Sequence, residues 1–363
     1  MYSLQANIQE LINQFVAEEK EKGIQVAVYV AGELVVNAWA GIANDKTREL
    51  VTADTLFPVF STTKGLVATI INLLAERGQL SYDAPIADVW PEFSQNGKAE
   101  ITVRDVLFHA SGIPQMPAGI GYEELVQWER MCSEIARLEP LWKAGTRIEY
   151  HAMTFGWILG EVARRVDGRP FSQMVHDEIC APLGIETMFV GIPESLARSV
   201  ARLEADDTTP VSSIPTLYQA VPDWIGPLHA MMNRKEVQQA CIPASNGILN
   251  ALSIARHYAA LLPGGVDGVE LLSSERVKIA TRPQRLQHPE TEDYPKSWGM
   301  GYQLGFEGSI YGPDSSAFGH DGYGGSVGFA DPSLQMAVGI TRNCFRSEET
   351  QRILCSAIRC HLA

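Results

Sequence analysis

Hydrophobic and polar positions alternate in two different ways over the first forty residues. Apolar side chains separated by three or four positions predict an amphipathic helix within residues 1–20. They are Ile8, Leu11, Ile12, Phe15 and Val16. The β-branched runs 24–30 and 34–39 follow, and between them lies a short segment that contains Gly32. This arrangement is typical of a β-hairpin.

The middle of the chain has a helical pattern. Residues 66–75 are apolar on nearly every side, and a helix of that kind lies in the interior of a protein rather than on its surface. Further helices are predicted over 155–166 and 171–179, and each ends at a glycine or proline signal. The proline-rich segment 206–233 contains aromatic residues and is expected to be an ordered loop.

Strand-like sequence returns toward the C-terminus. Strands are predicted over 298–305, 325–330 and 336–343, and a final helix over 348–361. Strands near both ends with helices between them predict an α+β fold. In this fold one antiparallel sheet is flanked by the terminal helices, and a mainly helical region is inserted into it.

The same pattern suggests how the chain divides. Residues 1–60 and 245–363 are expected to form one α/β domain from both ends of the chain. Residues 61–244 are expected to form a mainly helical domain, with the active site between the two. The length of 363 residues is sufficient for two such units and a large core.

Composition and charge exclude several classes of partner. The formal net charge is -14, with 29 basic and 43 acidic residues, which argues against binding to nucleic acid. No run of 18 apolar residues exists, so the sequence predicts no membrane span. The six cysteines are scattered and no secretory signal precedes the first helix, which together favour a cytoplasmic location.

The most informative local feature is the pair Ser61 and Lys64 at the start of the apolar helix. Residues three apart on a helix share one face, so the amine can lie beside the hydroxyl. Serine needs a neighbouring base to act as a nucleophile, and a buried lysine can supply one because burial lowers its pKa. The alternative is a helix cap and a solvated lysine, but solvated lysines do not usually open helices that are apolar on every side.

Three blocks in this order carry a family resemblance. They are Phe60–Gly65, Trp142–Gly156 and Phe318–Pro332. With them the chain resembles the serine β-lactamase and penicillin-binding-protein superfamily over roughly residues 8–360. Within it the chain is most similar to the class C β-lactamase-like esterases, the family VIII carboxylesterases. The resemblance implies a β-lactamase/transpeptidase-like fold.

The resemblance also implies roles for single residues. Ser61 matches the acylated nucleophile, Lys64 its amine partner and Tyr150 the tyrosine that moves protons. Either Lys64 or Tyr150 could be the working base. His320 and Gly322 lie in the block that replaces the family's K-T-G motif, and the backbone N–H groups of Ser61 and Tyr323 match the two oxyanion donors.

Departures from the family pattern concern the substrate. Ala152 stands where lactamases of this class have an asparagine that contacts the acylamide side chain of a β-lactam. His320 replaces a lysine, and Asp321 would repel an anion if it faces the site. These changes favour small neutral esters over β-lactams.

Other candidate features have less support. Residues 324–328 fit the G-x-S-x-G pattern around Ser326, but a strand rather than a helix is expected after them. The histidines lack metal-ligand spacing, and His151 is expected to form structural hydrogen bonds. Met231, Met232 and Trp224 could line an acyl pocket, although core packing explains the methionines equally well.

The sequence therefore predicts a serine hydrolase that cleaves small carboxylic esters through an acyl-enzyme and needs no cofactor or metal. An acyltransferase using the same intermediate is the first alternative, followed by a β-lactamase or D,D-peptidase. A catalytically inactive scaffold is disfavoured because Ser61, Lys64 and Tyr150 are all present. The expected partner is a small ester or acyl compound, and the sequence assigns no oligomeric state.

Overall fold

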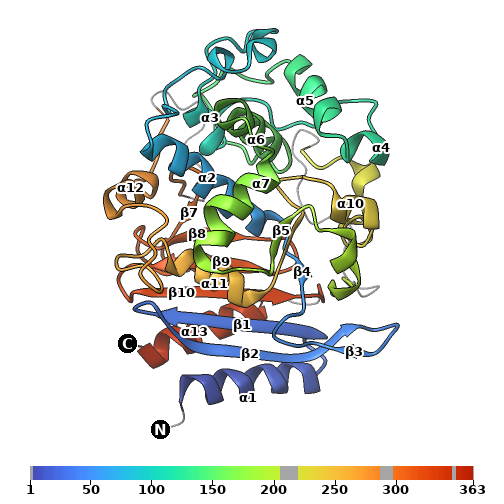
Figure 1. The fold of residues 1–363 in the computed structure, drawn as a ribbon, viewed down its shortest axis with the longest axis vertical. Helices are drawn as coiled ribbons and strands as arrows, with labels where there is room; N and C mark the ends of the chain where they lie inside the picture. The colour runs from blue at the N-terminus through green and yellow to red at the C-terminus, as the bar shows by residue number, and fades with distance from the viewer. Residues whose placement is uncertain (1–2, 205–219, 287–296, 346–348, 363) are drawn as a thin grey trace.

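A computed structural model describes residues 3–204, 220–286, 297–345 and 349–362. Its main element is a seven-stranded antiparallel sheet with the strand order β3-β2-β1-β10-β9-β8-β7. The strands are β1 (Gly23–Val30), β2 (Glu33–Asn44), β3 (Glu49–Leu50), β7 (Gln303–Leu304), β8 (Phe318–Asp321), β9 (Val327–Asp331) and β10 (Met336–Arg342). Strands from the two ends of the chain thus form one sheet (Figure 1).

The two terminal helices lie on one face of this sheet (Figure 1). Helix α1 (Leu4–Ala17) packs on β2 and on α13 (Glu349–Leu362). The apolar positions that predicted the first helix fit this packing, since Ile8, Ile12 and Phe15 are buried in an apolar cluster shared with the sheet. On the opposite face of the sheet, α11 (Ala251–Ala259) packs against β1, β9 and β10.

The helical part of the molecule lies beyond α11 (Figure 1). Helix α2 (Lys64–Glu76) is buried at every position from Lys64 to Ala75, as its all-round apolar pattern predicted, and α6 (Thr154–Asp167) packs against it. The remaining α-helices of the described ranges are shorter than these two. They are α3 (Val103–Leu107), α4 (Tyr122–Leu125), α5 (Trp128–Arg137), α7 (Phe171–Val175), α8 (Ala181–Leu183), α9 (Leu228–Met232), α10 (Lys235–Gln239) and α12 (Ser274–Ala280).

A second, three-stranded sheet joins the helical part to the rest. Its order is β4-β6-β5, formed by β4 (Phe57–Pro58), β6 (Gly247–Leu249) and β5 (Met188–Val190). These strands come from both sides of the domain boundary expected from the sequence, and that boundary stays a prediction. The small sheet matters for the site because β4 leads directly into Ser61.

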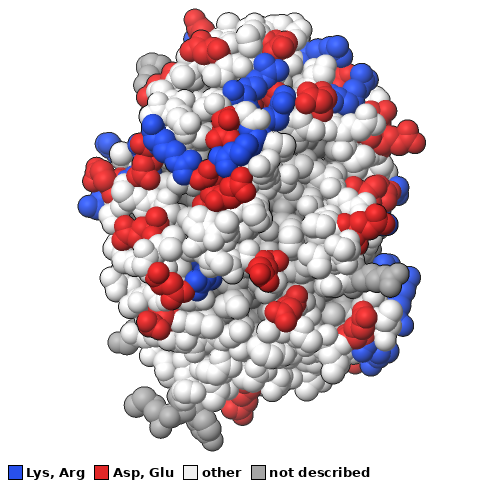
Figure 2. Space-filling view, viewed as in Figure 1, with Lys and Arg blue, Asp and Glu red and all other residues white. Residues whose placement is uncertain are grey.

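Charged side chains of both signs lie next to one another over the helical part of the face shown in Figure 2. Ion pairs are frequent in this part of the chain. Arg169, for example, pairs with Asp167, Asp177 and Glu178. The Arg169 pairs are partly buried, whereas exposed pairs such as Lys235 with Glu194 contribute at most about 1 kcal/mol each. Within the described ranges, no helix has both the length and the apolar character needed to cross a membrane.

The structure confirms the α+β fold class and revises some element boundaries. Only Gln303–Leu304 of the strand predicted over 298–305 pairs in the large sheet. The strand predicted over 325–330 begins at Val327, because Gly324 and Gly325 turn the chain with φ of 83° and 94°. Of the predicted loop 206–233, residues 206–219 lie outside the described ranges, and Leu228–Met232 is helical.

Candidate active site

Ser61 lies in a tight turn between β4 and α2. It opens the single 3₁₀ turn η1 (Ser61–Thr63), and the backbone of Phe60 before it has a φ of 49°. A φ in the left-handed region is rare for a bulky residue and marks a conformation imposed by the surrounding fold. The Ser61 side chain stays half-buried, while the neighbouring Thr62 and Thr63 are buried. The turn therefore presents the serine hydroxyl at the edge of the core.

Lys64 is completely buried directly behind this serine. Its Nζ lies 3.1 Å from Ser61 Oγ and donates hydrogen bonds to the carbonyl oxygens of Ala152 at 2.7 Å and Ala244 at 2.8 Å. No carboxylate among the described residues forms an ion pair with it. Burial therefore lowers the pKa of Lys64 well below its usual value, against a smaller upward effect of the Asp321 charge. An amine in this state can accept a proton from the serine hydroxyl.

Tyr150 completes the group from the loop before α6. Lys64 Nζ lies 4.9 Å from the centroid of its half-buried ring. The ring also contacts the rings of His109 at 4.8 Å, Trp298 at 5.9 Å and His320 at 6.1 Å, all centroid to centroid. The structure thus brings Ser61, Lys64 and Tyr150 together from two separate segments.

The end of β8 forms the opposite wall of the site and packs against the turn that carries Ser61. His320 is buried, and its Nδ1 lies 2.7 Å from the carbonyl oxygen of Asp321. Since a carbonyl only accepts, Nδ1 carries the proton, and in the neutral ring Nε2 is the basic nitrogen. Gly322 follows, where a Cβ would lie only 2.1 Å from the carbonyl oxygen of Val59. A side chain at this position would force β8 away from the serine turn.

Asp321 does not line the site with His320. Successive residues of a strand point to opposite faces. The Asp321 carboxylate accepts a hydrogen bond of 2.7 Å from the hydroxyl of Tyr311, which is buried in the apolar cluster under the terminal helices. Asp321 was expected to repel an anionic substrate only if its carboxylate faced the site. The carboxylate points toward Tyr311 instead, so this effect is not expected. Its charge acts at a distance, through the pKa of Lys64.

Ser326, the serine of the G-x-S-x-G pattern, is buried and structural. Its Oγ donates to the carbonyl oxygen of Val59 at 2.7 Å and lies 3.1 Å from Thr62 Oγ1. These bonds fasten the Gly322–Ser326 turn to the turn that carries Ser61. The strand β9 follows, as expected from the sequence, where a nucleophile elbow would require a helix.

His151 forms structural hydrogen bonds, as expected. Its Nδ1 donates to the carbonyl oxygen of Glu149 at 2.6 Å, and its Nε2 accepts from the backbone N–H of Ile113 at 3.1 Å. Burial lowers the pKa of His151 to about 4, so the ring is neutral near pH 7. The ring fixes the backbone beside Tyr150 and leaves the proton transfers to other groups.

The methionines considered for an acyl pocket are part of the core. Met231 and Met232 are fully buried and offer no surface to an acyl chain. Trp224 is half-buried and packs edge-on against Tyr122 with centroids 5.4 Å apart.

Two residues at the site were not predicted. His109 and Trp298 both contact Tyr150 through their rings. His109 lies in a segment with no catalytic pattern of its own, and its backbone φ of 63° could not be read from the sequence. The sequence pattern places Trp298 in a strand, and no periodicity relates it to Tyr150.

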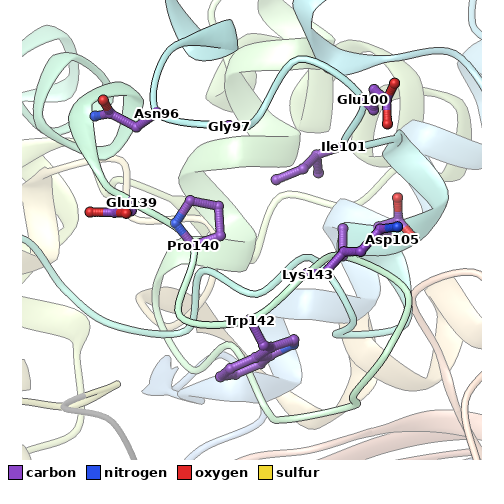
Figure 3. A pocket seen from close by; sticks show the side chains of 10 residues that line it. Asn96, Gly97, Glu100, Ile101, Asp105, Glu139, Pro140, Trp142 and Lys143 are labelled. Atoms are coloured by element: carbon purple, nitrogen blue, oxygen red, sulfur yellow. The ribbon is translucent and has the colours of Figure 1, made fainter. Parts of the chain in front are cut away.

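A separate cavity of about 430 Å³ lies in the helical part, between the loop around Gly97 and the segment before Tyr150 (Figure 3). Its lining is Asn96, Gly97, Glu100, Ile101, Asp105, Glu139, Pro140, Trp142, Lys143 and Ala144. None of the predicted site residues belongs to it. In the part of the chain that the structure describes, no three histidine, cysteine or acidic side chains cluster in a way that could hold a metal.

Known proteins match the chain over almost its whole length. Residues 8–360 match the family model described as Beta-lactamase. Among curated proteins, the chain is 33% identical over 335 residues to the "Esterase/beta-lactamase LipL" of Mycobacterium tuberculosis, an alignment that covers 88% of this chain and 77% of that protein.

Solved structures match over a similar extent. A penicillin-binding-protein homologue from Caulobacter crescentus has a TM-score of 0.88 and 32% identity, covering 98% of this chain and 97% of its own. A structure described as a family VIII carboxylesterase has a TM-score of 0.87 and 31% identity, with the same coverage. Both similarities extend across the large sheet and the helical part.

Proposed function

The chain belongs to the β-lactamase family, and on this premise we propose that it is a serine carboxylesterase with Ser61 as its acylated nucleophile. The esterase names of its relatives support this function. The observation that carries the assignment of the nucleophile is the contact between Ser61 Oγ and Lys64 Nζ at 3.1 Å. Lys64 is fully buried and its pKa is lowered well below the usual value, so it can be neutral when the substrate arrives.

In the proposed reaction, Ser61 Oγ attacks the ester carbonyl carbon while its proton passes to Lys64 or Tyr150. The carbon–oxygen bond to the alcohol then breaks, and the alcohol leaves with a proton from the same pair. Water then attacks the acyl carbon and gives a proton to the pair. The bond between that carbon and Ser61 Oγ breaks, the pair returns the proton to Ser61 Oγ, and the acid leaves. The backbone N–H groups of Ser61 and Tyr323 are the proposed donors to the oxyanion, and His320 lines the site beside Tyr150.

The proposed substrates are small neutral esters. Ala152 contributes its carbonyl oxygen to Lys64, and its methyl side chain offers no amide to a substrate. His320 is a buried imidazole and not a fixed positive charge. The carboxylate and the acylamide of a β-lactam would therefore each lack one polar partner in this part of the site.

An activated phosphonate ester tests the assignment of the nucleophile. We expect one equivalent to add to the wild-type protein and none to Ser61→Ala, as measured by intact mass. Ser326→Ala is the matched control and should still take up one equivalent, because the labelled oxygen belongs to Ser61; loosening the turn that Ser326 fastens affects only the rate of labelling. Labelling that persists in Ser61→Ala would overturn the proposed nucleophile.

β-Lactam hydrolysis is the second candidate because the curated relative carries both activities in its name. Each polar group left unpaired costs about 1–3 kcal/mol, so two lost partners predict a kcat/KM about 10²–10⁴ higher for a short nitrophenyl ester than for a chromogenic cephalosporin. Equal kcat/KM values for the two substrates would favour the lactamase function over the esterase function. Acyl transfer uses the same intermediate, and an added alcohol that yields a new ester would detect it.

The cytoplasmic location also stays a prediction. No disulfide joins any of the six cysteines, all of which lie in the described ranges, and four of them are buried, which supports a reducing compartment. Fractionation of the native host followed by immunodetection would test it. The proposed partner is the small acyl substrate itself.

A further inference from the structure

Trp298 occupies a special position between the two halves of the proposed site. Its ring is stacked on Tyr150 with centroids 5.9 Å apart and planes within 19°, and it lies 5.8 Å from the ring of His320. Tyr150 belongs to the segment before α6 and His320 to the large sheet. The indole therefore contacts one proposed functional residue from each side.

The contacts of the Trp298 side chain are aromatic and apolar. The side chain is 1% exposed, and its Nε1 has no hydrogen-bond partner among the described residues. Phe108 and Ala110 complete its apolar surroundings. Since a buried indole N–H usually finds an acceptor, hydrogen bonding does not explain why this ring lies here. The stacking on Tyr150 does.

His109 supports the same arrangement from another direction. Its ring lies 4.8 Å from Tyr150 and meets Trp298 edge-on at 4.3 Å. Its Nδ1 accepts a hydrogen bond of 3.2 Å from the backbone N–H of His151, and its carbonyl oxygen accepts one of 3.0 Å from that of Glu149. These two bonds tie His109 to the residues on either side of Tyr150.

We propose that Trp298 and His109 are positioning residues that hold the ring of Tyr150 where its hydroxyl can exchange protons with Ser61 and Lys64. The proposal rests on the proposed esterase function, because it assigns a task to these residues within that reaction. A phenol attached to a loop can rotate about two side-chain bonds, and a displacement of about 1 Å can reduce a rate about 10²-fold. A wall of two rings, each fixed by buried contacts, removes this freedom before the substrate binds.

A double-mutant cycle between Trp298 and Tyr150 tests the proposal on a neutral nitrophenyl ester. We expect Trp298→Leu to lower kcat about 10- to 100-fold, as misplacement of a catalytic group does, with little change in KM. In a Tyr150→Phe background the same change should cost less than about threefold, because no hydroxyl is left to misplace. Trp298→Phe, which keeps an aromatic face, should restore most of the wild-type kcat.

An equal loss of kcat from Trp298→Leu with and without the Tyr150 hydroxyl would overturn the proposal, and so would no loss in the wild-type background. Trp90→Leu is the matched control, because Trp90 is a buried indole that packs on Phe93 outside the site. It should leave kcat unchanged. If it lowers kcat as much as Trp298→Leu does, loss of any buried indole explains the result and the proposal is wrong.

His109→Asn provides a second measurement if Trp298→Leu does not fold. Asparagine tolerates the φ of 63° at this position and offers an amide oxygen to the His151 N–H, so the substitution removes mainly the ring. It should lower kcat in the wild-type background and not in the Tyr150→Phe background, and an equal loss in both would contradict the proposal. Phosphonate labelling of Ser61 separates the two proposals: an unlabelled wild-type protein contradicts the esterase function, whereas labelled variants with additive losses contradict only the positioning role.

Discussion

Among the residues that the structure describes, two lysines are buried in similar surroundings, and only one of them lies beside the proposed nucleophile. Lys64 and Lys98 are both fully inaccessible to solvent. Each donates to two backbone carbonyl oxygens, those of Ala152 and Ala244 for Lys64 and those of Gln95 and Leu138 for Lys98. Each also lies near an aromatic ring, and burial lowers the pKa of both, to about 8 for Lys98.

The two lysines differ in the groups that lie near the side-chain nitrogen besides these carbonyl oxygens. Lys64 has Ser61 Oγ at 3.1 Å and the ring of Tyr150 at 4.9 Å. Lys98 follows Gly97, which lines the separate cavity together with Glu139 (Figure 3). The charge of Glu139 raises the pKa of Lys98 against the larger effect of burial. No serine or threonine hydroxyl hydrogen-bonds to Lys98 among the described residues.

The comparison shows that a lowered lysine pKa does not by itself identify a catalytic group. Perturbed pKa values are enriched at functional sites, but structural lysines have them too. The arrangement around Lys64 carries the assignment, because a hydroxyl, a phenol and a strand end converge on it. The following predictions separate the two lysines experimentally.

The largest expected difference is in catalysis. Lys64→Met should lower kcat on a neutral ester at least about 10²-fold, the scale of lost general acid–base catalysis, because methionine fills the space without a basic nitrogen. Lys98→Met should leave kcat unchanged. Steady-state kinetics on the two variants make the comparison, and equal losses would mean that the proposed site is not confined to Lys64.

The next effect concerns stability. An unfolded lysine has a pKa near 10.4, and folded Lys98 titrates at about 8, so between these pH values the unfolded chain binds the additional proton. The contribution of Lys98 to the free energy of unfolding therefore rises with pH across this window, by at most about 3 kcal/mol. Urea unfolding of wild type and Lys98→Met at pH 7.5 and pH 10 measures it. The free energy of unfolding of wild type, relative to that of Lys98→Met, should be higher at pH 10 than at pH 7.5. The same difference at both pH values would contradict the lowered pKa.

The smallest effect is a shift in a pH profile. The Asp321 charge raises the pKa of Lys64, so Asp321→Asn should lower that pKa further while keeping an oxygen for the Tyr311 hydroxyl. If neutral Lys64 is the base, kcat/KM falls as the pH drops through its pKa, and in the variant this fall should move to lower pH by up to about one unit. Asp314→Asn, which removes an exposed charge, should leave the profile in place. A shift to higher pH in Asp321→Asn would exclude Lys64 as the base.

Much of the fold could be predicted because periodicity reports burial directly. The hairpin of β1 and β2 and the buried helix α2 follow from runs of apolar residues whose spacing has one good structural interpretation. The short strands β4 and β5 could not be predicted, since two or three residues carry no period. Both pair with β6, which lies far along the chain, as between Phe57 and Leu249.

The candidate site divides in the same way. Ser61, Lys64 and Tyr150 could be proposed from local motifs because the family pattern places them at fixed spacings. The sequence motif alone does not give the orientation of Asp321. It could have been inferred from its place next to His320, because adjacent residues of a strand point to opposite faces. Trp298 and His109 could not be found, because their contacts with Tyr150 depend on three separate segments that meet only in the folded molecule.

The pairing of β1 with β10 has a consequence for how the protein is made. Ile24 lies opposite Arg342, so β1, an inner strand of the large sheet, cannot pair with β10 until the ribosome has added more than three hundred further residues. Until then one edge of β1 has unpaired backbone groups, and such an edge can pair with the same strand of another nascent chain. Newly made chains should therefore depend on chaperones, and slow synthesis of the last forty residues should reduce the yield of folded protein without changing its final stability.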